Sequence, residues 1–443
     1  MRRVMAVLLM FALVLTLAAC GAKSVGTEEP TGIVTAATKN ETSKVPTGET
    51  ITFALPSQWA NKAAMQQLVD KYFKETGNTV EISALDDKSY MNLYLAKLAG
   101  GDFYDVIYGK TGPGVAALNI EENFVDFTNE DWVKEIDQSI LESFLLNNNK
   151  VYGAPLGGTN VIGIVYNKTI FAELGLEIPK TETEFVNVCE KIKAAGKTPI
   201  YLAGKDIWPL VQFANAEWPA IEAANPGIVA KFNENKASFA NTKEALDFAT
   251  KMQNYSKMGF YNTDCLTATY DMLLKEFAEN NAAMIFMGDW IAADLNTKFP
   301  GTDFGMFARP TDSGEVYISS TAPDVMYVYK NSDKVDVAID FIRFWQKSEN
   351  RDIWFADNAN MPVYQGQQVE NLNVIAKDAQ QYFKTGNVRG HWHNRMSVIN
   401  TDDFFRNYQL LVSGDITPLD FLTKMDENFA MVGRDLKIPG FEG

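Results

Sequence analysis

The chain has 443 residues, of which 46% are hydrophobic and 12% aromatic, and its 40 basic and 56 acidic side chains give a net charge of −16. This acidity argues against a nucleic-acid-binding surface and against a domain held on anionic lipid by charge, because both need clustered Lys and Arg. The chain is long enough for two domains with large hydrophobic cores.

The N-terminal residues have the pattern of a secretory signal. Arg2 and Arg3 precede an uncharged apolar run over residues 4–17, which is too short to be a comfortable membrane span. Small residues follow the run, as a signal peptidase requires. We therefore expect residues 1–19 to be removed from the mature protein.

A cysteine follows the apolar run directly. The sequence Leu-Ala-Ala-Cys-Gly at 17–21 resembles the bacterial lipobox, in which the cysteine is acylated and becomes the first residue of the mature chain. The resemblance implies lipidation of Cys20; the alternative is an ordinary signal peptide with an incidental cysteine. Residues 20–49 are rich in Gly, Thr, Ala, Glu and Pro, which predicts a flexible tether.

Strands and helices alternate from residue 51 onward. Short apolar or alternating segments at 51–55, 79–83 and 105–108 predict strands, and the segments between them have apolar residues at helical spacing. This β-α-β-α-β order predicts a parallel sheet, whose ligands bind at the carboxyl ends of the strands. The candidate ligand residues on the loops after these strands are Gln58, Trp59, Asp87 and Tyr108.

Further helices are predicted later in the chain. Thr181 and Glu184 have the spacing of a capping box for a helix that ends near residue 195, and apolar stripes predict helices at 242–258, 270–279 and 335–346. Cys189 lies on the apolar stripe of the first of these helices, so we expect it to be buried as a small hydrophobic side chain. Its pairing with Cys265 is left open, because the spacing does not suggest a cystine framework.

Several segments resemble motifs of the family 1 extracellular solute-binding proteins. The first is Gly-Asp-Phe-Tyr-Asp-Val-Ile at 101–107, with Tyr104 where the family usually has proline. The second is Lys-Val-Tyr-Gly-Ala-Pro at 150–155, followed by Val-Tyr-Asn-Lys at 165–168. The third is the segment 277–284 with Gly-Asp-Trp at 288–290, and it has Asn280 where glycine is common. The resemblance covers the chain from about residue 51 to the C-terminus.

The resemblance implies an α/β fold of the type II periplasmic-binding-protein class. In this clamshell, each of two lobes is a mixed β-sheet flanked by helices, and a ligand binds between them when a hinge closes. The chain is expected to cross between the lobes near Pro155, Ser320 and Ser348. Lobe I would then comprise residues 50–155 and 321–348, and lobe II residues 156–320 and 349–443.

The resemblance also nominates ligand residues in the second lobe. Sugars need flat aromatic platforms beside in-plane polar groups. Trp290 of the Gly-x-Trp motif would stack on a sugar ring, and Asp289 would bind hydroxyls; alternatively, Trp290 fills the lobe beneath the cleft. Asp206 and Trp208 lie in a stretch that resembles the family segment supplying an acid and aromatics to the ligand.

The sequence His-Trp-His at 391–393 raises the question of a metal. The chain has only these two histidines and no cysteine near them, so the ligand set is incomplete and no metal or other cofactor is expected. We instead consider Trp392 a candidate cleft aromatic and Arg395 a candidate hydrogen-bonding partner of the ligand.

These observations predict a monomeric lipid-anchored binding protein on the extracellular face of the cytoplasmic membrane. It would capture a carbohydrate, an oligosaccharide by the family resemblance, and deliver it to the permease subunits of an ABC importer. No nucleophile, zinc-protease or phosphate-loop motif is present in the sequence, so no catalytic residues are assigned. The alternatives are a secreted carbohydrate-active enzyme and an adhesin-type lipoprotein.

Overall fold

The computed structural model describes residue 45 and residues 47–86, 89–396 and 401–442, which belong to one compact unit that begins at Val45. The expected signal peptide and the predicted lipidation site Cys20 lie outside the described residues, as does Asp87. Within the described ranges, no helix is both long enough and apolar enough to cross a membrane.

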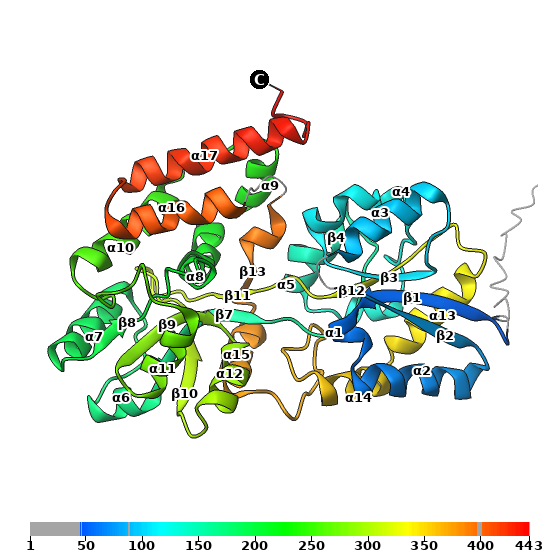
Figure 1. Cartoon of the computed structure of the whole chain (residues 1–443), viewed down its shortest axis with the longest axis horizontal. Helices are drawn as coiled ribbons and strands as arrows, with labels where there is room; N and C mark the ends of the chain where they lie inside the picture. Colours follow the sequence, from blue (N-terminus) through cyan, green and yellow to red (C-terminus); the bar gives the residue numbers. More distant parts are fainter. Residues whose placement is uncertain (1–44, 46, 87–88, 397–400, 443) are drawn as a thin grey trace, which may run out of the picture. The chain divides into compact units, whose positions relative to one another are not determined.

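The first lobe is built on a mixed sheet with the strand order β2-β1-β3-β12-β6 (Figure 1). Its strands are β1 (Thr50–Pro56), β2 (Thr79–Leu85), β3 (Val106–Gly109), β6 (Ala154–Pro155) and β12 (Val325–Val328). β1 is parallel to β2 and β3, whereas β12 is antiparallel to β3 and β6. The predicted parallel start of the fold is confirmed, and the carboxyl ends of β1, β2 and β3 meet at one edge.

Helices and short turns cover this sheet. They are α1 (Ser57–Ala60), α2 (Ala63–Thr76), α3 (Tyr90–Gly100), η1 (Gly112–Leu118), α4 (Ile120–Asn123), η2 (Asp131–Glu135), α5 (Gln138–Ile140), η3 (Leu141–Leu145), the hairpin β4 (Leu146–Asn147) and β5 (Lys150–Val151), α13 (Val335–Trp345) and α14 (Ser348–Asp357). α2 and α3 end at Gly77 and Gly101, which adopt the left-handed conformation that glycine tolerates best. The apolar face of α13 supplies Phe341 and Trp345 to the first core.

The second lobe is built on a sheet with the order β13-β11-β7-β9-β8, and β10 also pairs with β7. Its strands are β7 (Val161–Asn167), β8 (Thr198–Ile200), β9 (Ala282–Gly288), β10 (Phe304–Phe307), β11 (Ile318–Ser320) and β13 (Val388–Gly390). Every residue of β9 is buried, which fits a central strand covered on both faces. Neighbouring residues on these strands belong to different hydrophobic clusters: Ile164 and Phe286 to one, and Val165 and Ile285 to another. This is expected because successive side chains of a strand point to opposite faces of the sheet.

Three of the helices around the second sheet, over residues 182–194, 243–257 and 270–278, agree closely with predicted segments. The helices around this sheet are α6 (Lys168–Glu173), α7 (Glu182–Ala194), α8 (Trp208–Ala224), α9 (Ile228–Asn233), α10 (Lys243–Lys257), α11 (Tyr270–Ala278), α12 (Ile291–Lys298), α15 (Val374–Thr385), η4 (Trp392–Arg395), α16 (Thr401–Ser413) and α17 (Pro418–Asp435). Cys189 on α7 is completely buried, as expected, and both Cys189 and Cys265 are free thiols.

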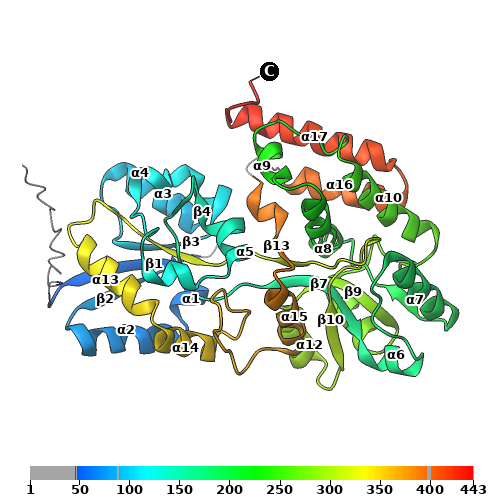
Figure 2. The same cartoon turned by 180° about the vertical axis from the view of Figure 1, so that it is seen from behind.

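The third crossing lies later in the chain than Ser348, where the sequence placed it. α14 lies beside α2 of the first lobe in Figures 1 and 2, and Trp354 packs within 6.1 Å of Trp59 and 5.3 Å of Trp345 between ring centroids. Tyr364 still belongs to the first core. Because Trp354 and Tyr364 are buried in the first core, we place the third crossing between Tyr364 and Val374.

Candidate functional site

The segments that join the two sheets meet at a pair of glycines. A Cβ on Gly157 would lie 2.3 Å from Nε1 of Trp354, and a Cβ on Gly158 would lie 2.2 Å from the carbonyl oxygen of Met361. The next residue, Thr159, has its hydroxyl 3.0 Å from that of Ser320 on the second crossing. The first crossing therefore contacts the second at Ser320, and at the two glycines it contacts the segment that leads into the third; this close approach is possible only because Gly157 and Gly158 lack side chains.

Trp59 and Tyr108 lie at the carboxyl edge of the first sheet, as the topology predicted. Trp59 is half-buried on α1, and Gln58 beside it is exposed. Tyr108 is only 3% exposed, and its hydroxyl donates a hydrogen bond of 2.6 Å to Asp324. Tyr108 therefore supports the wall of the cleft, while Gln58 and Trp59 keep surface that a ligand can reach.

Asp324 is a residue of this region that the sequence analysis missed. It lies on the second crossing, pairs with Lys110 and accepts the hydrogen bond from Tyr108. Burial and the nearby carboxylate of Asp324 raise the pKa of Tyr108, so the phenol stays protonated and remains a donor. No local pattern pointed to Asp324, because its partners lie more than 200 residues away in the sequence.

Asp206 and Trp208 are brought together by Tyr270, which the sequence analysis placed only as the first residue of a helix. The carboxylate of Asp206 accepts a 2.7 Å hydrogen bond from the backbone N–H of Tyr270 at the start of α11. The rings of Trp208 and Tyr270 are 4.9 Å apart, and the hydroxyl of Tyr270 donates to Asp294 at 2.8 Å. Trp208 is 37% exposed, so this pair offers an aromatic surface beside two carboxylates.

Asp289 and Trp290 end the central strand β9 and differ in exposure. Asp289 is 2% exposed, and its carboxyl accepts a 3.3 Å hydrogen bond from the N–H of Val161. Burial raises the pKa of Asp289 to about 7. In this structure the carboxyl of Asp289 is buried and bonded to the backbone of Val161, so its expected contact with a ligand stays a prediction.

Trp290 remains half-buried beside this acid. Its ring packs over Gly288, where a Cβ would lie 1.9 Å from the indole, and it touches both cores of the second lobe. The two interpretations of Trp290, a stacking platform and a plug beneath the cleft, both stay open, because the ring packs against the cores and still keeps accessible surface.

Trp392 is not a cleft aromatic. It is completely buried, its ring stacks on Trp218 with centroids 4.4 Å apart, and its Nε1 donates to Asn215 at 3.1 Å. The expectation was wrong because α8 supplies a hydrophobic partner that the polar sequence around residue 392 does not suggest. Arg395 forms a bidentate ion pair with Glu222, with Nη1 2.8 and 2.7 Å from the two carboxylate oxygens.

The two histidines lie on either side of Trp392. Their ring centroids are 5.2 Å apart, and Nδ1 of His391 is 2.6 Å from Oδ1 of Asn394. Desolvation lowers the pKa of His391 to about 4 and that of His393 well below its usual value, so both imidazoles are neutral near pH 7. Among the described residues, no group of three or more His, Cys, Asp or Glu side chains is arranged to hold a metal.

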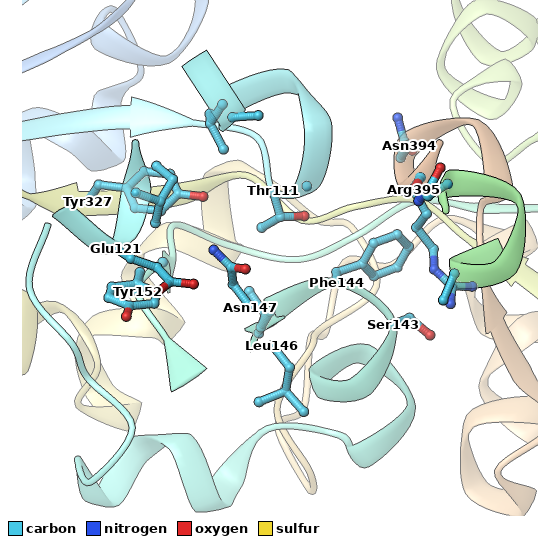
Figure 3. A pocket seen from close by; sticks show the side chains of 18 of the residues that line it. Thr111, Glu121, Ser143, Phe144, Leu146, Asn147, Tyr152, Tyr327, Asn394 and Arg395 are labelled. Atoms are coloured by element: carbon cyan, nitrogen blue, oxygen red, sulfur yellow. Dashed lines mark hydrogen bonds between the residues drawn. The ribbon is translucent and has the colours of Figure 1, made fainter. Parts of the chain in front are cut away.

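A cavity of about 730 Å³ is lined by both lobes (Figure 3). The first lobe contributes residues of η1, α4, η3 and the β4–β5 hairpin, and the second contributes α9 and η4. Phe144, Tyr152 and Tyr327 provide aromatic surface, and Asn147 provides an amide. Arg395 is the predicted ligand residue that lines it, whereas the other predicted residues that the structure describes lie elsewhere on the lobes. The volume is typical of a site for a small ligand.

This chain belongs to the family of bacterial extracellular solute-binding proteins, whose sequence profile matches residues 56–352, more than half of the chain. It is similar to the multiple sugar-binding protein of Streptococcus mutans, with 30% identity over 42% of this chain and 44% of the relative. It is also similar to the melibiose/raffinose/stachyose-binding protein MelE of Bacillus subtilis, with 23% identity over 59% of this chain and 61% of the relative. The matched stretches thus span about half of these relatives.

Solved structures show the same two-lobed fold over nearly their whole length. A putative binding protein from Bacillus subtilis in an open conformation superimposes with a TM-score of 0.74 and 18% identity, covering 88% of this chain and 98% of the other. The raffinose complex of the solute-binding protein RafE superimposes with a TM-score of 0.64 and 19% identity, covering 86% and 98%. The predicted fold class and family are confirmed.

Proposed function

We propose that this solute-binding protein captures a carbohydrate, specifically an oligosaccharide, between its two lobes. The observation that carries the proposal is the cavity of about 730 Å³ that both lobes line with aromatic and hydrogen-bonding side chains. Rings such as Phe144 and Tyr152 suit the C–H faces of a sugar, and Asn147 and Arg395 suit its hydroxyls. The names of the relatives, which include binders of melibiose, raffinose and stachyose, support the same class of ligand.

The aromatic residues on the neighbouring loops are proposed to share in binding. Trp59 on the first lobe and Trp208, Tyr270 and Trp290 on the second each keep accessible ring surface near carboxylates or amides. Asp206 and Gln58 complete the proposed set. Asp289 is also proposed to fix the start of β7 through Val161.

We further propose that Cys20 anchors the chain to the outer face of the cytoplasmic membrane and that a monomer delivers its sugar to an ABC permease. The lipobox-like residues 17–21 and the composition of residues 20–49 support the anchor and the tether. Delivery without chemical change is proposed because the family consists of solute-binding proteins.

A thermal-shift screen tests the proposed ligand class. A sugar that binds only the folded state raises the melting temperature by mass action. We expect raffinose or stachyose to raise it in a concentration-dependent manner, and chromatography of the incubated sugar should recover it unchanged. Stabilisation by peptides or polyamines alone would contradict the carbohydrate assignment, and released products would indicate an enzyme.

A further inference from the structure

The first crossing between the lobes runs directly against a buried tryptophan of the first lobe. Trp354 on α14 is 2% exposed, and a Cβ on Gly157 of the crossing would lie 2.3 Å from its Nε1 and 2.8 Å from its Cδ1. The same indole lies 6.1 Å from the ring of Trp59 between centroids. We propose that Trp354 is a positioning residue that links the backbone of the first crossing to Trp59; this inference rests on the proposed function, in which Trp59 contacts the sugar.

The indole of Trp354 is held in place by its neighbours. Besides Trp59 it contacts Trp345, with ring centroids 5.3 Å apart. Nε1 of Trp345 donates a 3.0 Å hydrogen bond to the carbonyl oxygen of Leu156, which precedes Gly157 in the crossing. Because protein interiors are close-packed, we expect a shift of the backbone at Gly157 to move the indole of Trp354 rather than to be absorbed by a void.

Trp59 in turn depends on α14 for its position. It lies on α1, a single turn of four residues in which no residue is fully buried. The next helix, α2, lies beside α14 (Figures 1 and 2), and the backbone N–H of Ala64 on α2 donates a 3.1 Å hydrogen bond to the carboxylate of Asp357 on α14. A single helical turn is not stable by itself, so the position of α1 follows that of the helix it packs against.

Movement of the crossing and the position of Trp59 are therefore linked. Gly157 comes just before the place where the segments that join the lobes meet. Thr159 exchanges backbone hydrogen bonds of 2.7 and 3.0 Å with Met361, and its hydroxyl lies 3.0 Å from that of Ser320. Relative movement of the lobes must change backbone torsions in these segments. A sugar that packs on Trp59 would thus favour one arrangement of the crossing and shift the population of lobe arrangements.

Gly157→Ala tests the link because its Cβ crowds Trp354. The φ of Gly157 is not positive, so alanine acts through this contact and not through backbone strain. Trp59 is followed in the ligand-free full chain by the difference in fluorescence emission between each protein and the same protein with Trp59→Phe. We expect Gly157→Ala to shift the maximum of this difference spectrum. The shift should disappear in the Trp354→Leu background, because leucine lacks the indole nitrogen that the Cβ meets.

Calorimetric titration with raffinose or stachyose, whichever binds, measures the effect on affinity. Gly157→Ala and Trp354→Leu should each weaken binding by about ten-fold, although both residues are buried and neither can touch the sugar. The double variant should bind about as weakly as Trp354→Leu alone, because both changes act through the same contact. Losses that instead multiply to about a hundred-fold would show that the two residues act independently, and would overturn the inference.

Gly433→Ala is the matched control. Its Cβ would also meet an aromatic ring, 2.4 Å from Cγ of Phe441, at a glycine of α17 whose φ is not positive. It should lower the melting temperature and leave both the Trp59 spectrum and sugar affinity unchanged. If it changes them as much as Gly157→Ala does, general destabilisation explains the result and the inference is wrong.

A second pair of variants decides the question if Gly157→Ala does not fold. Trp354→Leu should weaken sugar binding by about ten-fold, whereas Trp354→Phe, which keeps a ring between Trp59 and the crossing, should weaken it by less than about three-fold. Equal losses in the two variants, or no loss in either, would show that Trp354 does not position Trp59.

The ligand-free spectra separate this inference from the proposed function. If sugar binds but Gly157→Ala leaves the Trp59 spectrum unchanged, Trp354 is not a positioning residue and the carbohydrate function stands. If the wild type binds no carbohydrate, the proposed function fails, and the spectra of Gly157→Ala with and without Trp354→Leu alone decide whether Trp354 links the crossing to Trp59.

Discussion

Trp290 packs against both hydrophobic clusters of the second lobe and is only partly buried. Its lower face covers Gly288, which leaves no room for a side chain beneath the indole. The ring is therefore fixed before any ligand arrives, and a sugar that stacks on it would meet a preformed surface. Stacking on a fixed ring loses less conformational entropy than stacking on a mobile one.

Trp290→Ala should weaken sugar binding by about ten- to a thousand-fold, because an aromatic platform at a binding centre contributes a few kcal/mol. The buried face predicts an accompanying loss of a few degrees in the melting temperature of the ligand-free protein. Calorimetry and thermal unfolding of the same variant measure both effects. A destabilised variant that binds sugar with wild-type affinity would show that Trp290 only fills the lobe.

Because the pKa of Asp289 is raised, we expect its contribution to the free energy of unfolding to depend on pH. Its pKa is raised to about 7 in the folded protein from an ordinary value near 3.8, so the folded state binds more protons than the unfolded state between these values. Its contribution to the free energy of unfolding should therefore be full below about pH 4 and should fall as pH rises toward 7. Asp289→Asn should remove this slope.

The measurement is the difference in unfolding free energy between wild type and Asp289→Asn from pH 4.5 to 8. Taking the difference cancels the opposite slope expected from His391, whose lowered pKa makes its contribution decrease as pH falls below about 6.5. A difference that does not vary with pH would show that Asp289 is ionised in the folded protein at all of these values.

Single residues were predicted well where local sequence decides their surroundings. Trp59 lies on α1 directly after β1, as the strand pattern predicted, and Trp208 is the first residue of α8, in the stretch that the family resemblance nominated; neither side chain is fully buried. The burial of Trp392 and Asp289 was not predicted because it depends on distant partners, Trp218 on α8 and Val161 on β7. When an element distant in the sequence buries a residue, the residues next to it in the sequence give no indication of that burial.

At the scale of elements, Arg309 links three helices of the second lobe. It follows β10, is 1% exposed, and forms ion pairs with Glu182 on α7 and Glu217 on α8. Its Nη2 also donates to the hydroxyl of Tyr255 on α10 at 2.8 Å, and its guanidinium lies 4.6 Å from the ring centroid of Phe185. A buried charge with this many partners fixes how the helices pack against the sheet.

Arg309→Met should lower the free energy of unfolding by about 3–5 kcal/mol, because it leaves the buried Glu217 without its cation and leaves the partly buried Glu182 with only the more distant Lys251. Urea denaturation followed by tryptophan fluorescence measures the loss. Adding Glu217→Gln to the variant should recover part of it by removing one of those charges. An equal or larger loss in the double variant would mean that packing, and not charge, determines the effect.

The predicted bounds of α7, α10, α11 and α13 agree with the observed bounds to within one or two residues. Each of these helices has a continuous apolar stripe and clear signals for where it begins and ends. The capping box at Thr181 is only half formed. The hydroxyl of Thr181 accepts from the N–H of Glu184, but the Glu184 carboxylate accepts from Lys180 instead of Thr181. Spacing predicts which residues can cap a helix, whereas the path of the preceding chain decides which donor is reached.

At the scale of the whole molecule, ligand-induced closure is the main prediction. A sugar that contacts both lobes binds more tightly when they approach, so it shifts the population toward a closed form. Small-angle scattering should show a smaller radius of gyration in saturating raffinose or stachyose, whichever binds. Trp290→Ala at the same sugar concentration provides the control. An unchanged radius at saturation would contradict closure.

Attachment to the membrane is a second prediction at this scale. Replacing Cys20 with Ala removes the thiol that the lipobox-like sequence presents for acylation. The variant should appear in the culture medium, while the wild type should fractionate with membranes. A variant that stays membrane-bound as strongly as the wild type would require a different anchor.

The division of the chain between the lobes could be predicted only in part. The first two crossings were placed near Pro155 and Ser320 by the family resemblance, and β6 and β11 end at these residues. The third was placed too early because α14 continues the helical pattern of α13 and gives no sign that Trp354 packs beside Trp59. The sequence pointed to only a small part of the lining of the cavity, namely Arg395 and the motif at 150–155, since η1, η3 and α9 carry no motif.

The position of β12 within the first sheet has a consequence for how the protein folds. β12 pairs with both β3 and β6, yet it follows β6 only after the whole of β7 to β11. Until residue 328 is available, β3 and β6 have unpaired edges, and the first lobe cannot close its sheet. Such long-range pairing raises contact order and slows folding. A chain truncated before Val325 should therefore expose a β3 edge that is prone to aggregation, even though all three parallel strands of the first sheet are present.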